Sequence, residues 1–196
     1  MWIQPYPIIL ASKSPRRREL LGNIGLEFKV MVPETEEPKA GNMPPAEYAA
    51  LTSQLKCEAV SALKEAENHL IIAADTVVVL GNEILGKPKD ERDAHRMLAA
   101  LSGREHKVCT GVTVMLGGRT VSFTETTAVR FRNMTEDEIT AYIATGEPMD
   151  KAGAYGIQKR GAVFVQSVCG DYFNVVGLPL CSLTKTLAEF GVYIKA

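Results

Sequence analysis

Residues 8–21 read Ile-Ile-Leu-Ala-Ser-Lys-Ser-Pro-Arg-Arg-Arg-Glu-Leu-Leu. The apolar run Ile8–Ala11 is typical of a short buried strand, and the polar residues after it predict a turn. Ser14 suits the N-cap of a helix, and Pro15 suits its first helical position. The stretch therefore predicts a strand that leads through a tight turn directly into a helix, as in an α/β fold.

Strand patterns recur along the rest of the chain. Residues 28–32 alternate between apolar and polar side chains, residues 71–80 form an almost continuous apolar run, and residues 162–168 form another. Gly81-Asn82 predicts a turn into a short strand at residues 83–85. A long hairpin is predicted around Gly117-Gly118, and its two strands are expected in a central sheet.

Helix patterns lie between these strands. Asp90 is expected to cap one helix that ends at Gly103, and Thr135 with Glu138 forms a capping box for another. A last amphipathic helix is expected after Pro179, and residues 33–45 are expected to form a proline-rich loop. A further helix is predicted with a buried stripe through Tyr48, Leu51, Leu55, Ala59 and Leu63. Since no repeat or linker interrupts the pattern, we expect one mixed α/β domain over residues 1–196.

The composition excludes several classes of function. The chain has 22 basic and 23 acidic residues and a net charge of -1, so no global field would attract a nucleic-acid polymer or an anionic membrane. The four cysteines are scattered without CxxC spacing, which argues against a zinc site and a disulfide framework, and we expect them to behave as small hydrophobes. The first residues hold only a four-residue apolar run, so we expect a cytoplasmic protein without a membrane span.

The turn after the first strand is a candidate phosphate site. Free backbone N–H groups and the positive end of the helix dipole favour anions at a helix N-terminus. Arg16, Arg17 and Arg18 add donors suited to phosphate oxygens. The alternative is that these arginines only decorate a solvated first turn.

Asp75 interrupts the long apolar strand, where an unpaired carboxylate would be costly to bury. Either a structural salt bridge with a lysine or a role in catalysis would account for it. Lys56 lies at the border of the predicted apolar stripe of its helix, from where it could reach into a cleft. Lys87 lies between Gly86 and Pro88, which restrict where its ammonium group can point.

Two loops add candidate ligand groups. Residues 150–158 carry Gly153 and Gly156, which permit close backbone approach, and end at Gln158, whose amide offers a donor and an acceptor to a pyrimidine edge. The proline-rich loop carries Glu34, Glu36 and Glu37, which could supply oxygen ligands to Mg²⁺. A plain glycine-rich turn and an acidic solvent-facing loop are the alternatives. The histidines at positions 69, 95 and 106 show no ligand spacing and are expected at the surface or in the hairpin.

Taken together, these segments resemble the motifs of the Maf family of nucleotide pyrophosphatases, in the same order and over nearly the whole chain. The matching stretches are residues 10–21, the Lys56 helix, and residues 74–78, 86–88, 101–103, 150–158, 170–172 and 174–180. The resemblance implies an elongated α/β fold with a mixed sheet, flanking helices and a deep cleft between two lobes, similar to inosine triphosphate pyrophosphatases.

The resemblance also implies an activity. It makes Asp75 the proton acceptor, assigns base selection to Arg16, Thr76 and Gln158, and makes Ser12, Arg17, Lys56 and Lys87 the remaining catalytic residues of the cleft. Residues 14–17, 75–76 and 156–158 match the subgroup that hydrolyses dTTP and UTP to the monophosphate and pyrophosphate.

A divalent cation is also implied by the resemblance. It would be Mg²⁺, Mn²⁺ or Co²⁺, held by Asp75 and by Glu37, or Glu36 in its place. The resemblance suggests a homodimer as well. Two other functions remain open: hydrolysis of modified nucleotides, and a nucleotide sensor that regulates cell division or septum formation without turnover.

Overall fold

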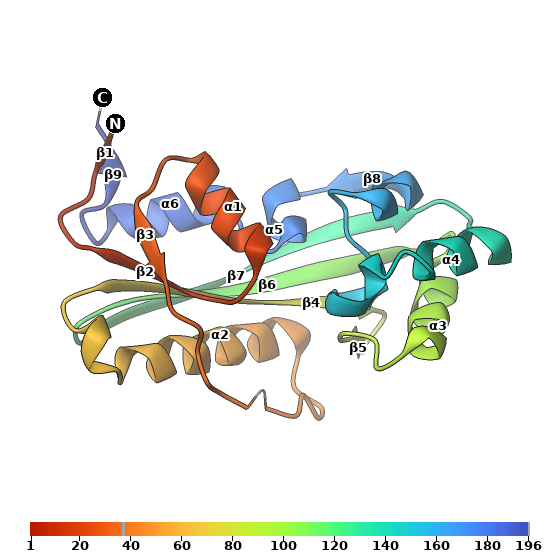
Figure 1. The fold of residues 1–196 in the computed structure, drawn as a ribbon, viewed down its shortest axis with the longest axis horizontal. Coiled ribbons are helices and arrows are strands. Elements are labelled where there is room, and N and C mark those ends of the chain that lie inside the picture. The colour runs from red at the N-terminus through yellow and green to blue at the C-terminus, as the bar shows by residue number, and fades with distance from the viewer. Residues whose placement is uncertain (37, 196) are drawn as a thin grey trace. The chain divides into compact units, whose positions relative to one another are not determined.

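The computed structural model describes residues 1–36 and 38–195, and its central element is a seven-stranded mixed sheet (Figure 1). The strand order is β3-β2-β4-β6-β7-β8, and β5 pairs with β4. The strands are β2 (Ile8–Ala11), β3 (Phe28–Val30), β4 (Leu70–Leu80), β5 (Glu83–Leu85), β6 (Glu105–Leu116), β7 (Arg119–Phe131) and β8 (Val165–Cys169). The predicted mixed α/β class, with a central sheet and flanking helices, is confirmed.

The chain divides into two compact units. The first unit contains residues 1–75, 110–125 and 177–196, and the second contains residues 76–109 and 126–176. The chain passes from one unit to the other inside β4, β6 and β7, so that each of these long strands contributes to both. The single domain over residues 1–196 stays a prediction.

The first unit is built on parallel strand pairing. Strand β2 pairs in parallel with β3 and β4, and Ala11 lies opposite Ala73. Helix α2 (Pro45–Ser61) covers one face of these strands, while α1 (Pro15–Asn23) and α6 (Leu180–Ala188) lie on the other face (Figure 1). A separate small sheet pairs β1 (Trp2–Ile3) with β9 (Tyr193–Ile194) in antiparallel fashion. The strand, turn and helix predicted for residues 8–21 are confirmed.

Helix α2 exists as predicted, but its predicted apolar stripe is confirmed only at Tyr48, while Leu51, Leu55 and Ala59 are half-buried. Leu63 lies beyond the helix end and is 43% exposed. Apart from Tyr48, the buried face carries mostly small side chains: Ala49, Thr52, Ser53, Cys57 and Val60. The cause is Gly111 in β6, since a Cβ at this position would collide with the backbone of Ala49. Close approach of helix and sheet selects small residues, and the buried Ser53 and Thr113 hydroxyls satisfy each other at 2.8 Å.

The second unit holds α3 (Glu91–Leu101), α4 (Glu136–Ile143) and α5 (Tyr172–Val176). The Asp90 carboxylate accepts a hydrogen bond from the Asp93 N–H at 2.7 Å, which confirms the predicted start of α3. At α4 both bonds of the predicted capping box form: Thr135 N–H donates to Glu138, and Glu138 N–H donates to the Thr135 hydroxyl. Local capping chemistry thus sets both helix starts.

The predicted strand at residues 162–168 is wrong in its first half. Residues Arg160–Phe164 form a 3₁₀ turn, and the strand is Val165–Cys169. Phe164 turns inward and packs edge-on against Tyr142, with ring centroids 5.2 Å apart, while Val163 is 63% exposed. The apolar run therefore reflects an aromatic cluster rather than a strand buried on both faces.

All four cysteines are free thiols, of which two are buried and two are exposed. Cys57 and Cys109 are buried and fit the prediction of small hydrophobic residues. Cys169 and Cys181 are exposed, so the prediction is wrong for them. Burial raises the pKa of the Cys57 thiol to about 12, which makes it a poor nucleophile.

Candidate functional site

The turn between β2 and α1 places Ser12 and Arg17 in contact. Ser12 is buried, and its Oγ accepts hydrogen bonds from the Ser14 N–H and from Arg17 Nη1, each at 3.2 Å. Arg17 Nε also donates to the Gly177 carbonyl at 2.7 Å. Ser14 occupies the N-cap of α1 as predicted, although its side chain makes no cap bond. The guanidinium of Arg17 is thus held at the start of the helix, and Arg16 lies half-buried beside it in the same turn.

Asp75 forms an ion pair with Lys56. The Lys56 Nζ lies 2.6 Å from Asp75 Oδ1, and the two side chains are only 15% and 12% exposed. The parallel register of β2 and β4 brings the end of β2 beside the residues of β4 that lead to Asp75. The lysine salt bridge that the sequence allowed is therefore present. Two charges held this far from solvent interact more strongly than an exposed pair.

The remaining predicted residues belong to the second unit. Thr76 is half-buried on β4, while Lys87 and Gln158 are exposed on loops. The two loops meet, because the Gly153 N–H donates to the Gly86 carbonyl at 3.0 Å. Gly153 has a φ of 67° and lies so close to the Val78 side chain that a Cβ would approach it to 2.9 Å. Within this unit the structure brings residues 86–88, residues 150–158 and β4 together.

The metal prediction is tested only in part. Glu37 lies outside the described residues. Within residues 1–36 and 38–195, no three His, Cys, Asp or Glu side chains come together as a set that could hold a metal ion. Mg²⁺ is commonly bound through one or two carboxylates together with substrate phosphates and water. A site of that kind needs fewer than three protein ligands, so the metal ligands Asp75 and Glu37 stay a prediction.

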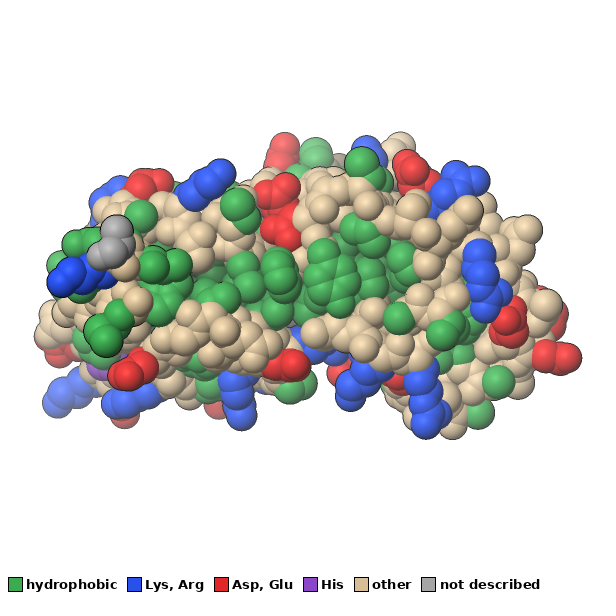
Figure 2. Space-filling model, turned by 90° about the horizontal axis from the view of Figure 1, so that it is seen from above, with side chains coloured by type: hydrophobic (Ala, Val, Ile, Leu, Met, Phe, Trp, Pro, Cys, Tyr) green, Lys and Arg blue, Asp and Glu red, His purple; other side chains and the backbone are tan. Residues whose placement is uncertain are grey.

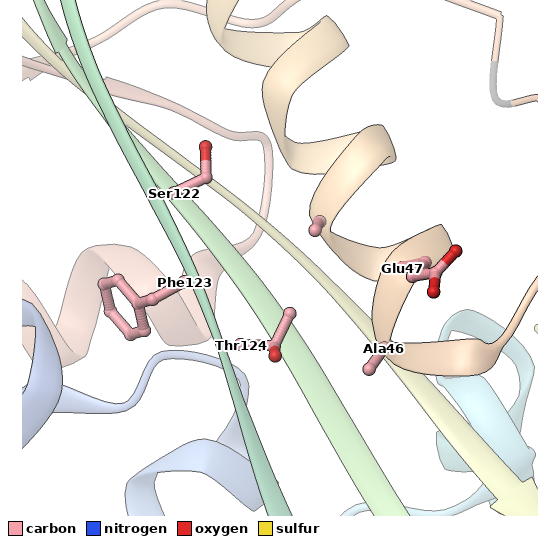
Figure 3. A pocket seen from close by; sticks show the side chains of 6 residues that line it. Ala46, Glu47, Ser122, Phe123 and Thr124 are labelled. Carbon is pink, nitrogen blue, oxygen red and sulfur yellow. The ribbon is translucent and has the colours of Figure 1, made fainter.

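A pocket of about 260 Å³ lies elsewhere in the first unit, between the start of α2 and β7 (Figure 3). It contains none of the predicted site residues, and Glu47 is the only ionisable residue in its lining. The lining residues are Ala46, Glu47, Ala50, Ser122, Phe123 and Thr124.

Polar contacts that no sequence pattern indicated organise the loop around Gln158. Tyr142 is buried on α4, and its hydroxyl donates to Glu147 Oε1 at 3.0 Å. Glu147 had no assigned role, and its position between Gly146 and Pro148 was the only available signal. His106 lies in the hairpin, as one alternative had it, but it is buried rather than at the surface. Its Nε2 lies 2.8 Å from the Tyr155 hydroxyl, and burial lowers its pKa to about 4.

On the face drawn in Figure 2, basic and acidic side chains are interspersed, and neither kind gathers into one continuous patch. Among the described residues, no helix combines the length and the apolar character that crossing a membrane requires.

Two known proteins match this chain over nearly its whole length. A Bacillus cereus protein and a Bacillus cytotoxicus protein, both named dTTP/UTP pyrophosphatase, are 45% and 48% identical to this chain over 185 and 182 residues. These matches cover 94% and 93% of this chain and 96% and 94% of the two relatives.

The fold also has a solved counterpart. The Ham1 protein of Staphylococcus aureus superposes with a TM-score of 0.53 over 93% of this chain and 98% of its own, at 17% identity. At that identity the likeness shows the fold alone. The family model described as Maf-like protein matches residues 7–190. The ordered motifs, the extent of this match and the two Bacillus relatives together establish that the chain belongs to the Maf-like protein family.

Proposed function

We propose that the protein hydrolyses nucleoside triphosphates between the α- and β-phosphates, releasing a nucleoside monophosphate and pyrophosphate, with dTTP and UTP as substrates. The observation that carries the proposal is the pair of relatives named dTTP/UTP pyrophosphatase, which match over nearly their whole length. The arrangement of Asp75 and Lys56 supports it, because it provides a carboxylate and a cation in direct contact.

Asp75 is the proton acceptor in this proposal. Its carboxylate takes a proton from water as the water oxygen attacks the α-phosphorus, and the bond from the α-phosphorus to the bridging oxygen breaks, so that pyrophosphate leaves. Transfer reactions of this kind depend mainly on positioning and charge stabilisation, and they need no covalent nucleophile. Lys56, Arg17 and Lys87 supply positive charge for the phosphate oxygens, and Ser12 holds the Arg17 guanidinium.

Base selection falls to Arg16, Thr76 and Gln158. A glutamine amide can donate and accept at once, which matches the donor and acceptor on the edge of a uracil or thymine ring. A site that hydrogen-bonds its substrate rejects analogues that leave its polar groups unsatisfied.

Asp75 would also hold the divalent cation, together with the triphosphate. When bound, such an ion neutralises phosphate charge and polarises the phosphoryl oxygen. Glu37 would supply the second carboxylate. The homodimer stays a prediction, and analytical ultracentrifugation would test it.

The test is turnover of the common nucleoside triphosphates with Mg²⁺, Mn²⁺ or Co²⁺, with both products identified. We expect dTTP and UTP to give the monophosphate and pyrophosphate. Asp75→Asn should lower kcat by roughly a thousandfold, the usual scale for losing a general base. Asp137→Asn is the matched control, because Asp137 is exposed on α4, and it should leave kcat unchanged.

Two results would contradict the proposal. Release of inorganic phosphate in place of pyrophosphate would place the cleaved bond elsewhere. Full turnover by the folded Asp75→Asn protein would remove Asp75 from the proton transfer.

A further inference from the structure

The carboxylate of Glu147 collects three hydrogen bonds from the chain around it. The Tyr142 hydroxyl donates to Oε1 at 3.0 Å, the Gly161 N–H donates to Oε1 at 3.3 Å, and the Arg160 N–H donates to Oε2 at 3.2 Å. Two of these donors are backbone groups that follow Gln158 closely. Glu147 therefore holds the chain on the C-terminal side of Gln158.

The Tyr142 hydroxyl holds the chain on the other side. It accepts a hydrogen bond from the Gly156 N–H at 3.1 Å while donating to Glu147. Burial raises the pKa of this hydroxyl, so it remains protonated and able to donate. Gln158 lies midway between Gly156 and Arg160, whose backbone N–H groups donate to Tyr142 and Glu147 respectively. Tyr142 and Glu147 together form what we call the 142/147 clamp.

The chain inside the 142/147 clamp has little spare room. A Cβ at Gly161 would lie 2.6 Å from the Tyr142 hydroxyl oxygen, and one at Gly156 would lie 2.7 Å from the Lys151 side chain. Lys151 is itself tied down, since its ammonium donates to the Glu147 carbonyl at 2.6 Å. The loop is thus fixed by specific bonds and by close packing, although Gln158 at its tip is exposed.

We propose that Glu147 and Tyr142 are positioning residues that fix the location of the Gln158 amide and thereby set the preference for uracil and thymine bases. Neither side chain needs to touch the substrate, because each acts through the backbone of residues 156–161. The inference rests on the proposed function, in which Gln158 reads the base. A misplacement of this amide by about 1 Å would weaken recognition of the correct base without affecting the reacting phosphate.

The experiment compares wild type, Glu147→Gln and Tyr142→Phe for kcat and KM with UTP and with CTP. Glutamine has the shape of glutamate but offers one acceptor oxygen to three donors, and phenylalanine keeps the ring packed against Phe164. We expect each variant to lower the UTP/CTP ratio of kcat/KM by roughly tenfold, mainly through KM for UTP, as is typical for lost hydrogen bonds to a charged group. Glu136→Gln, the same change at an exposed position of α4, is the matched control.

A second readout does not depend on turnover. Amide hydrogen exchange should speed up at Arg160 and Gly161 in Glu147→Gln, and at Gly156 in Tyr142→Phe, relative to the control. If the folded variants keep the wild-type UTP/CTP ratio, or lose activity equally on both substrates, the clamp does not set specificity. If wild type itself hydrolyses neither UTP nor dTTP, the proposed function has failed instead, and the inference falls with it. If Glu147→Gln does not fold, the same comparison with Tyr142→Phe decides.

Discussion

At the scale of single residues, Asp75 shows how far sequence reasoning reaches. Its position inside an apolar strand predicted that a charged partner or a catalytic role was needed, and Lys56 is that partner at 2.6 Å. The sequence indicated a lysine without singling out which one, because the partner comes from a helix 19 positions earlier. Which roles the pair fulfils is a matter for the turnover experiment, since an ion pair and a proton acceptor use the same two side chains.

His106 carries a prediction about pH. Its side chain is buried against Phe131 and Tyr155, and burial lowers its pKa from 6.5 to about 4. Because the pKa is lower in the folded protein, the unfolded chain binds the proton at a higher pH than the folded one does. The contribution of neutral His106 to folding stability is therefore complete above pH 6.5 and is lost as the pH falls towards 4. Between pH 7 and pH 5, protonation of this residue alone should lower the free energy of unfolding by on the order of 2 kcal/mol.

Urea unfolding at these two pH values tests the prediction. His106→Gln removes the titrating group, so the drop in unfolding free energy between pH 7 and pH 5 should be smaller in the variant by about the same amount. Other titrating groups contribute equally to both proteins and cancel in the comparison. Equal drops in the two proteins would show that His106 is not held neutral by the fold.

At the scale of elements, the contact between α2 and β6 depends on one glycine. Gly111 allows the backbone of α2 to lie directly on the sheet at Ala49. Gly111→Ala should therefore lower the unfolding free energy by roughly 2 kcal/mol or more, as overpacking does where backbone cannot move aside. Since α2 also carries Lys56, turnover should fall in the same variant.

The chain offers a matched control for this change. A Cβ at Gly118 would meet no atom within 4 Å, and its φ does not lie in the left-handed region. The unfolding free energy of Gly118→Ala should therefore lie within about 0.5 kcal/mol of the wild-type value in the same urea titration. A Gly111→Ala protein as stable as Gly118→Ala would mean that α2 can shift without cost.

The elements also show why some predictions succeeded. Ile8–Ala11 and the capping box at Thr135 depend on neighbours in the sequence, and both are confirmed. The buried face of α2 and the turn Arg160–Phe164 depend on distant partners, Gly111 and Tyr142, that no local pattern reveals. In the same way the sequence indicated Gln158 but not Glu147. The hydrogen bonds of Glu147 join it to residues 142, 160 and 161, which come together only in the folded chain.

At the scale of the whole molecule, the three strands that run through both units have a consequence for unfolding. If either unit unfolds, the part of β4, β6 and β7 that belongs to it unfolds as well. Neither unit therefore keeps these three strands complete without the other. We expect a single cooperative transition in urea. Trp2, the only tryptophan in the chain, reports on the first unit, and far-UV circular dichroism reports on both. The two curves should coincide, whereas separated midpoints would show independent unfolding.

The exposure of two of the four thiols has a consequence for chemical labelling. Cys181 belongs to the first unit and Cys169 to the second, while Cys57 is buried with a raised pKa and Cys109 is buried. A maleimide reacts with accessible thiolates, so it should modify Cys169 and Cys181 well before the other two. Peptide mass mapping after brief exposure to the reagent would show this order of modification without any engineered cysteine.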